Sequence, residues 1–166
     1  GATWSLVQAG GDTTINPGSI TLTRASLSPS GNVALNGTNV KIAEYDVKAA
    51  GEPIKVTSLT VNIAMTTFTN LRNVKLTFDE GQIGTTQTSV ATPTSVAVAV
   101  NFTIPADGAM HKIAVWSDIA SASGAADALA SGDTFAVTLG GAAGAGALTL
   151  TNGQRQNALT TISVPG

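Results

Sequence analysis

The feature that most constrains the fold of this 166-residue chain is a period-two alternation of apolar and polar side chains. Such alternation is typical of β-strands that bury one face, because successive side chains of a strand point to opposite sides. About ten short runs show it, separated by turn residues at the spacing typical of antiparallel sandwiches and barrels. Besides a run at the N-terminus, they are 19–25, 40–49, 54–65, 73–84, 95–104, 110–119, 134–139, 147–150 and 158–164.

These runs predict an all-β fold of two antiparallel sheets, an immunoglobulin-like sandwich, with a jelly roll as the competing architecture. The Cys…Trp…Cys signature of antibody domains is absent, because the chain has no Cys. Only 119–131 has helical character, and Gly124 interrupts it, so at most one helical turn is expected. We assign 1–18 to an N-terminal strand and flexible hinge, and 19–166 to one sandwich domain.

Two runs change phase, which predicts a bulge or a local twist in each. The run 40–49 starts on the phase of Ile42 and continues on that of Tyr45. The run 54–65 changes in the same way after Val56, so this strand could serve two sheets.

The run 95–104 has large apolar side chains on one face and small side chains on the other. Its large side chains share one phase, whereas Ala97 and Ala99 occupy the opposite phase, so the second face could also pack against something. The segments 79–81 and 105–108 supply Asp, Pro and Gly at the positions where turns are expected.

Charged residues make up only 11% of the chain, against roughly 25% in typical globular domains. The surface must therefore consist largely of Thr, Ser, Asn, Gly and Ala, as in secreted wall or fibre proteins. The net charge is −2 and the basic residues are scattered, which excludes an electrostatic footprint for nucleic acid. No uninterrupted apolar run of about 18 residues exists, so no membrane span is predicted.

The absence of Cys excludes disulfides, thiol catalysis and thiolate metal sites. The first residue is Gly rather than Met, so we expect either a secreted chain without its signal peptide or a part of something larger. The first of these is preferred, and it predicts an extracellular or cell-surface location.

The residues that carry catalytic chemistry are scarce. His111 is the only His, so a His-rich metal site is excluded, and we interpret it as an ordinary residue at the end of a strand. No G-x-S-x-G nucleophile motif occurs. The Gly-rich segment 139–148 lacks the spacing and the Lys of a phosphate-binding loop. We therefore predict no enzymatic activity, no catalytic residues and no cofactor.

Two weaker hypotheses concern modification and metal binding. Asp118, Asp127 and Asp133 could supply oxygen ligands to Ca²⁺, but no known repeat supports this and Asp also suits turns for backbone reasons. No metal is therefore assigned. Asn36 and Asn101 begin N-x-T sequences and are candidate glycosylation sites, with Asn36 preferred because it lies in a predicted turn.

Two further sets of residues are candidates for surface chemistry. A covalent Lys–Asn crosslink stays open at Lys41, Lys48, Lys55, Lys75 and Lys112. A carbohydrate-binding module would use aromatic side chains that stack on sugars, here Trp4, Tyr45, Phe68 and Trp116.

The middle of the chain resembles the β-sandwich modules of secreted bacterial surface proteins, including S-layer-like and fibre-forming ones. The resemblance runs through LNGTNVKIAEYDVKAAGEPIKVTSLTVNI, LRNVKLTFDEGQIGT, VNFTIPADGAMHKIAVWSDI and SGDTFAVTL, approximately residues 36–139. These motifs are strand patterns and turns. The resemblance implies an immunoglobulin-like fold and a structural or adhesive role, and it carries over no catalytic residues.

Some filaments of related sandwiches assemble when the terminal strand of one subunit completes the sheet of its neighbour. Here Ala2, Trp4 and Leu6 alternate on one face of a terminal strand, and Gly10 and Gly11 follow as a hinge. The same strand could instead pair within its own subunit. We expect a self-assembling structural subunit of an extracellular filament or surface layer, whose partners are further copies of this chain. The alternative is an adhesive or carbohydrate-binding module of a larger surface protein.

Overall fold

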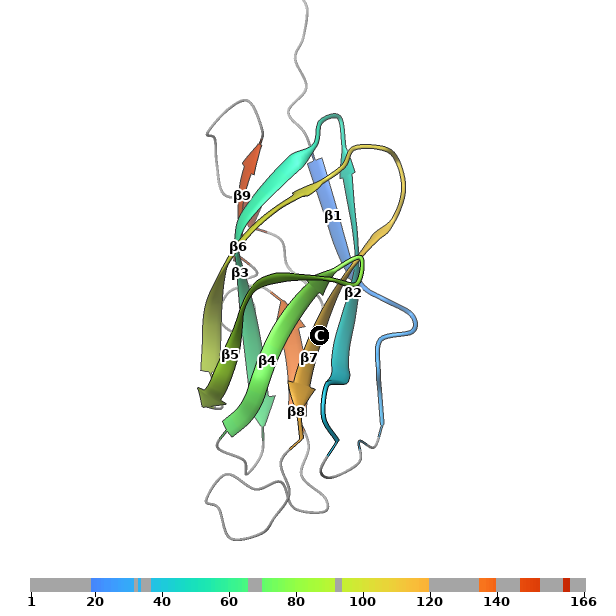
Figure 1. The fold of residues 1–166 in the computed structure, drawn as a ribbon. Helices are drawn as coiled ribbons and strands as arrows, with labels where there is room; N and C mark the ends of the chain where they lie inside the picture. The colour runs from blue at the N-terminus through green and yellow to red at the C-terminus, as the bar shows by residue number, and fades with distance from the viewer. Residues whose placement is uncertain are drawn as a thin grey trace, which may run out of the picture.

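The computed structural model describes residues 19–31, 33, 37–65, 70–91, 94–119, 135–139, 147–152 and 160–161. These residues form two antiparallel sheets that pack face to face as a sandwich (Figure 1). The predicted all-β class is therefore confirmed. The predicted terminal strand with Ala2, Trp4 and Leu6, and the predicted helical turn beyond Ile119, lie outside the described residues.

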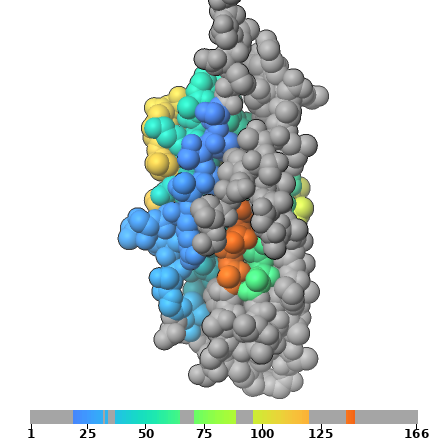
Figure 2. Space-filling view, turned by 180° about the vertical axis from the view of Figure 1, so that it is seen from behind, coloured from blue at the N-terminus to red at the C-terminus, as the bar shows by residue number. Residues whose placement is uncertain are grey.

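The first sheet has five strands in the order β1-β2-β7-β4-β5. All neighbouring pairs are antiparallel. In Figure 2, β1 and the segment that follows it run down one side of the molecule in blue. The strands are β1 (Ser19–Arg24), β2 (Val40–Ala50), β7 (His111–Asp118), β4 (Asn70–Phe78) and β5 (Gly81–Ala91).

The second sheet is built around β3 (Ile54–Met65), which pairs with β6 (Thr94–Ile104) on one side. On its other side, β8 (Phe135–Leu139) pairs with the C-terminal part of β3 and β9 (Ala147–Asn152) pairs with the N-terminal part. The short β10 (Thr160–Thr161) pairs with β9. One edge of β3 is therefore covered by two different strands.

The core lies between the two sheets and is filled by the apolar phase of each strand. Complete burial of one large apolar side chain contributes about 1.5–3 kcal/mol. Tyr45 on β2 brings a polar group into this core, where its hydroxyl donates a hydrogen bond of 2.6 Å to the carbonyl oxygen of Val137 on β8. This bond links the two sheets. The largest fully buried side chains are Tyr45, Leu59, Ile63, Leu71, Leu76, Ile104, Ile113, Ile119 and Leu139.

The two predicted phase changes are both confirmed as irregularities in strand pairing. The register of β2 against β7 shifts between Lys41 and Ala43, and that of β3 against β6 shifts between Val56 and Ser58. An extra residue in a strand moves all later side chains to the opposite face, which keeps the apolar ones in the core. Among the described residues, β3 nevertheless pairs only within the second sheet, which contradicts the expectation that it serves two sheets.

The segment 79–81 forms the predicted turn, and the strand after it extends beyond Gly84, where the predicted run ends, to Ala91. Asp79 and Glu80 have φ values of 44° and 71°, and Phe78 pairs with Gly81 across the turn. Positive φ at both central residues is typical of tight β-hairpins. The following strand β5 consists mostly of Gly, Thr, Gln and Ser, and most of its described side chains are exposed. Such an edge strand has little apolar pattern to detect.

The strand β5 also joins the two sheets at one side of the sandwich. A Cβ atom at Gly84 of β5 would lie 2.7 Å from the carbonyl oxygen of Ala99 on β6. Gly84 has a φ of 67°, which side-chain-bearing residues rarely adopt. Glycine at this position therefore permits the close approach of the two strands. Within the described residues, no helix is long and apolar enough to cross a membrane.

Candidate functional site

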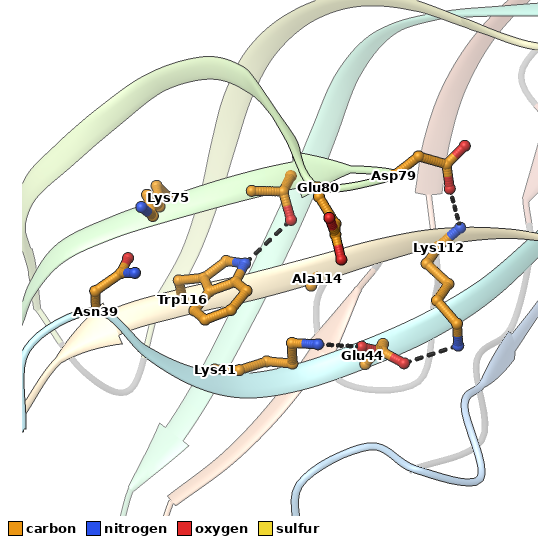
Figure 3. Close-up of a pocket in the computed structure, with 10 residues that line it drawn as sticks. Asn39, Lys41, Glu44, Lys75, Asp79, Glu80, Lys112, Ala114 and Trp116 are labelled. Atoms are coloured by element: carbon orange, nitrogen blue, oxygen red, sulfur yellow. Dashed lines mark hydrogen bonds and ion pairs between the residues drawn. The ribbon is translucent and has the colours of Figure 1, made fainter.

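The outer face of the first sheet carries a hollow of about 540 Å³ (Figure 3). The strand register creates its central row, because Trp116 on β7 lies opposite Lys41 on β2 and opposite Lys75 on β4. In the next row, Ala114 has a small side chain between Glu44 and Thr77, so the surface dips there. The lining residues are Asn39, Lys41, Glu44, Lys75, Thr77, Asp79, Glu80, Lys112, Ala114 and Trp116.

The indole of Trp116 is held in position from several directions. It is half-buried, and its Nε1–H donates a hydrogen bond of 3.0 Å to Oγ1 of Thr77. The ammonium nitrogens of Lys41 and Lys75 lie 5.2 and 5.9 Å from the centroid of its ring. Both distances fall within the range of cation–π attraction. The indole is therefore oriented before any ligand arrives.

Glu44 is the centre of the charges in the hollow. Its side chain is only 7% exposed, and its two oxygens accept hydrogen bonds from Lys41 at 2.5 Å and from Lys112 at 2.8 Å. Lys112 also pairs with Asp46 at 3.1 Å. The bonds from Lys112 and Lys41 lower the pKa of Glu44 against the opposing effect of burial. Glu44 is thus held ionised between two cations.

The same contacts disfavour a crosslink at these lysines. An isopeptide bond forms when a neutral amine attacks a carboxyl or amide carbon. The pKa of Lys112 is raised by its hydrogen bonds to Glu44 and Asp46, so its amine stays protonated. The lowered pKa of Glu44 likewise keeps this carboxyl ionised, so that it is a poor proton donor. Lys41 and Lys112 therefore act as ion-pair partners.

His111 joins two turns at the end of the sheet beside the hollow. Its Nδ1 lies 2.6 Å from a carboxylate oxygen of Asp79, and its Nε2 lies 3.3 Å from one of Asp107. The other oxygen of Asp79 accepts the backbone N–H of Lys112 at 2.9 Å. Hydrogen bonding to Asp79, and then to Asp107, raises the pKa of His111. Both ring nitrogens face carboxylates, so within the part of the chain that the structure describes neither faces the Ser or Thr hydroxyl that a catalytic triad requires.

Both carboxylate oxygens of Asp118 accept hydrogen bonds within the fold. One of its oxygens accepts the backbone N–H of Asn39 and the other accepts the side-chain amide of Asn73, both at 2.6 Å. These bonds lower the pKa of Asp118. Asn39 and Asn73 have positive φ values of 53° and 52°, which Asn tolerates better than most residues. Asp127 and Asp133, its predicted partners for Ca²⁺, lie outside the described residues. Within the described chain, no three His, Cys, Asp or Glu side chains form a group that could hold a metal ion.

The predicted site residues are only partly within the described chain. Ala2, Trp4, Leu6 and the first glycosylation candidate, Asn36, lie outside it. Asn101, the second candidate, is exposed on β6.

Of the four predicted sugar-stacking aromatics, the described residues include two. Trp4 and Phe68 lie outside them. Tyr45 is buried and its hydroxyl bonds to the other sheet, so its ring is not available to a ligand. Trp116 alone of the described candidates lines a hollow. The sequence pattern did not reveal the ion pairs around Glu44, because these pairs depend on which strands become neighbours.

The outer face of the second sheet is of a different kind. At the outward positions of β3, β6 and β8, Lys55 is the one charged residue among those that the structure describes. The other described side chains there are small or neutral: Ser58, Thr60, Asn62, Ala64, Ala97, Ala99, Asn101, Thr103, Ala136 and Thr138.

Comparisons of the chain with protein families, curated proteins and solved structures find no match.

Proposed function

We propose that this protein is a non-enzymatic structural subunit of an extracellular filament or cell-surface layer, built on an immunoglobulin-like sandwich. The observation that supports this most directly is the neutral outer face of the second sheet. Three alanines are exposed there and point away from the core between the sheets: Ala97 and Ala99 on β6, and Ala136 on β8. Apolar and small groups on an outer sheet face are suited to contact with another subunit.

The neutral face lowers the cost of contact between subunits. A charged group loses its hydration when a neighbour covers it, and this is costly unless an opposite charge is supplied. Ala97, Ala99 and Thr103 present no such group, and their small size allows the backbone of a neighbour to approach closely. The low content of charged residues in the whole chain, 11%, supports the same role.

The terminal strand offers a second way to assemble. Ala2, Trp4 and Leu6 could insert into the sheet edge of a neighbour, with main-chain hydrogen bonds and alternating side chains as the contacts. Contacts repeated head to tail would generate an open polymer. Both ways lead to a homopolymer, and they predict different sensitivities to mutation.

Size-exclusion chromatography and negative-stain electron microscopy test the proposal on four versions of the protein. The full chain should form oligomers or filaments. The double variant Ala97→Glu/Ala99→Glu should lose them if the neutral face is the contact, and deletion of residues 1–10 should lose them if strand exchange is the contact. The matched control is Thr21→Glu/Thr23→Glu, which adds the same charges at exposed positions of β1 and should assemble normally. A full chain that remains monomeric at high concentration would overturn the proposal.

The alternative function, an adhesive or carbohydrate-binding module, is favoured by a different observation, the hollow at Trp116. That hollow lies on the outer face of the other sheet. The two functions therefore do not exclude each other.

A further inference from the structure

The hollow at Trp116 contains polar groups that lie outside the ion pairs of Glu44. Within the described chain, Lys41 and Lys112 are paired with Glu44, whereas Lys75 and Glu80 make no ion pair. Figure 3 shows the carboxylate of Glu80 directed over Ala114, while Lys75 and Asn39 lie beyond the opposite end of the indole. Hydrogen-bond donors and one carboxylate that belong to none of these ion pairs thus lie toward the two ends of an aromatic side chain.

The charges that line the hollow exclude simple ions as its best ligands. The lining includes Lys41, Lys75 and Lys112, and equally many carboxylates, from Glu44, Asp79 and Glu80. An anion would meet the carboxylates, and a cation would meet the ammonium groups. A hydroxyl group both donates and accepts hydrogen bonds, so it can be satisfied by either kind of neighbour.

The shape of the hollow agrees with a small organic ligand. Its volume of about 540 Å³ lies within the usual range for such sites. Trp116 and Ala114 supply the apolar part of its surface, and an indole offers a flat apolar area on which the C–H face of a sugar ring can pack. Sugars combine this apolar face with hydroxyl groups around the ring.

We propose that the hollow binds a neutral oligosaccharide, with one sugar ring packed on Trp116. The hydroxyls on one side of this ring bond to Glu80, and those on the other side bond to Lys75 and Asn39. The bond from Trp116 to Thr77 fixes the indole in advance, which lowers the conformational entropy lost on binding. This activity goes beyond the proposed structural role and does not depend on it.

The first experiment measures binding of the full chain to soluble neutral polysaccharides by affinity electrophoresis. The panel contains mannan, mixed-linkage β-glucan, starch and galactan, with alginate and hyaluronan as acidic comparisons. Oligosaccharides of a retained polymer are then titrated calorimetrically. Retention by at least one neutral polymer is expected. Retention by the acidic polymers alone, or by none of the panel, would overturn the proposal.

Variants then place the binding in the hollow. Trp116→Ala should weaken binding by about tenfold or more, since it removes the packing surface. Glu80→Gln and Lys75→Met should each weaken it by about threefold, as expected for one hydrogen bond. Lys55→Met, on the opposite face, is the matched control for Lys75→Met and should bind normally.

Two controls separate a loss of sugar binding from a loss of folding and from a loss of assembly. Glu80 is exposed in a turn, so Glu80→Gln should remain folded even if Trp116→Ala does not, as circular dichroism will show. Binding that is unchanged in both Trp116→Ala and Glu80→Gln would overturn the proposal. The variants of the neutral face, Ala97→Glu/Ala99→Glu, should bind sugar normally, so a failure of assembly is distinguishable from a failure of sugar binding.

Discussion

The two outer faces of this sandwich obey the same alternation but carry opposite chemistry. The outer face of the first sheet holds Trp116 among ion pairs centred on Glu44, whereas that of the second sheet is almost free of charge in the described residues. Burying a charged group costs free energy unless an opposite charge pairs with it, whereas burying a small neutral group has no such cost. One face is therefore suited to a small polar ligand, and the other to contact with a large neighbour.

The difference shows at which positions this fold restricts the type of side chain and at which positions it does not. Inward positions must be apolar, because they form the core between the sheets. Outward positions carry no such requirement, so they can be assigned to different uses on the two faces.

The largest effect is expected at Gly84, where the first sheet meets the second. Gly84→Ala should lower the free energy of unfolding by roughly 2–4 kcal/mol, because the new Cβ combines an unfavourable positive φ with a backbone clash. Its Cβ would lie 2.7 Å from the carbonyl oxygen of Ala99. Urea denaturation measures the change. The control is Gly108→Ala, where φ is 82° and no atom lies within 4 Å of the added Cβ. It should cost only about 1 kcal/mol, and equal losses would contradict the close approach of β5 and β6.

A smaller loss is expected when the charge centre of the first face is removed. Glu44→Ala leaves Lys41 and Lys112 without this partner and should cost about 1–3 kcal/mol, less than a fully buried pair because both lysines remain partly exposed. Thr103→Ala on the neutral face should change stability by at most about 0.5 kcal/mol. Chemical denaturation of both variants gives the comparison, and a loss at Glu44 no larger than that at Thr103 would show that the ion pairs contribute nothing.

The same residue predicts a dependence on acid pH. Since the pKa of folded Glu44 is below its ordinary value of 4.5, its contribution is present above that pH and is lost as the pH falls through the lowered pKa. Glu44→Ala should therefore flatten the acid side of the stability profile. Unfolding curves between about pH 2 and pH 6 test this, and an unchanged slope in the variant would argue against the pairing.

Thr77→Val should produce a loss of about 1 kcal/mol, because the indole N–H of Trp116 loses its acceptor. The freed indole should also bind sugar less well, since its orientation is no longer fixed. Thermal unfolding and calorimetric titration measure the two effects. Thr23→Val at an exposed position of β1 is the control, and the bond to Thr77 has no orienting role if both variants bind alike.

The smallest effect concerns the two turns that His111 joins. Because the pKa of His111 is raised, its contribution is fully present below its ordinary pKa of 6.5 and is lost as the pH rises through the raised value. The loss should stay below about 1 kcal/mol, since Asp79 and Asp107 are both partly exposed. Melting temperatures across this range should fall with pH in the parent chain and less so in His111→Gln. Parallel curves would exclude the linkage.

The sequence predicted strands best where large apolar residues alternate regularly with small or polar ones. The apolar phase of 95–104 is inward in the structure, and Ala97 and Ala99 are exposed on the outside. The phase change after Ile42 corresponds to the irregularity between Lys41 and Ala43. The part of β5 beyond Gly84 escaped prediction, because an edge strand of Thr and Gln buries too little to need an apolar pattern.

The candidate site was harder to predict than the strands that carry it. Trp116 was one of four aromatic candidates, and no local pattern distinguished it from the other three. Its two cation partners, Lys41 and Lys75, are far apart in the sequence and become neighbours only because β2 and β4 flank β7. Local spacing carries no information about such pairs.

By itself, the sequence determined the class of fold, the approximate strands and the positions of two pairing irregularities. It did so because alternation and turn chemistry are local properties that burial imposes on each segment separately. The tertiary structure alone decided which strands are neighbours, and with that the enclosure of Glu44 by two lysines and the gathering of neutral side chains on the second sheet. Strand order depends on the packing of the whole chain, so no single segment encodes it.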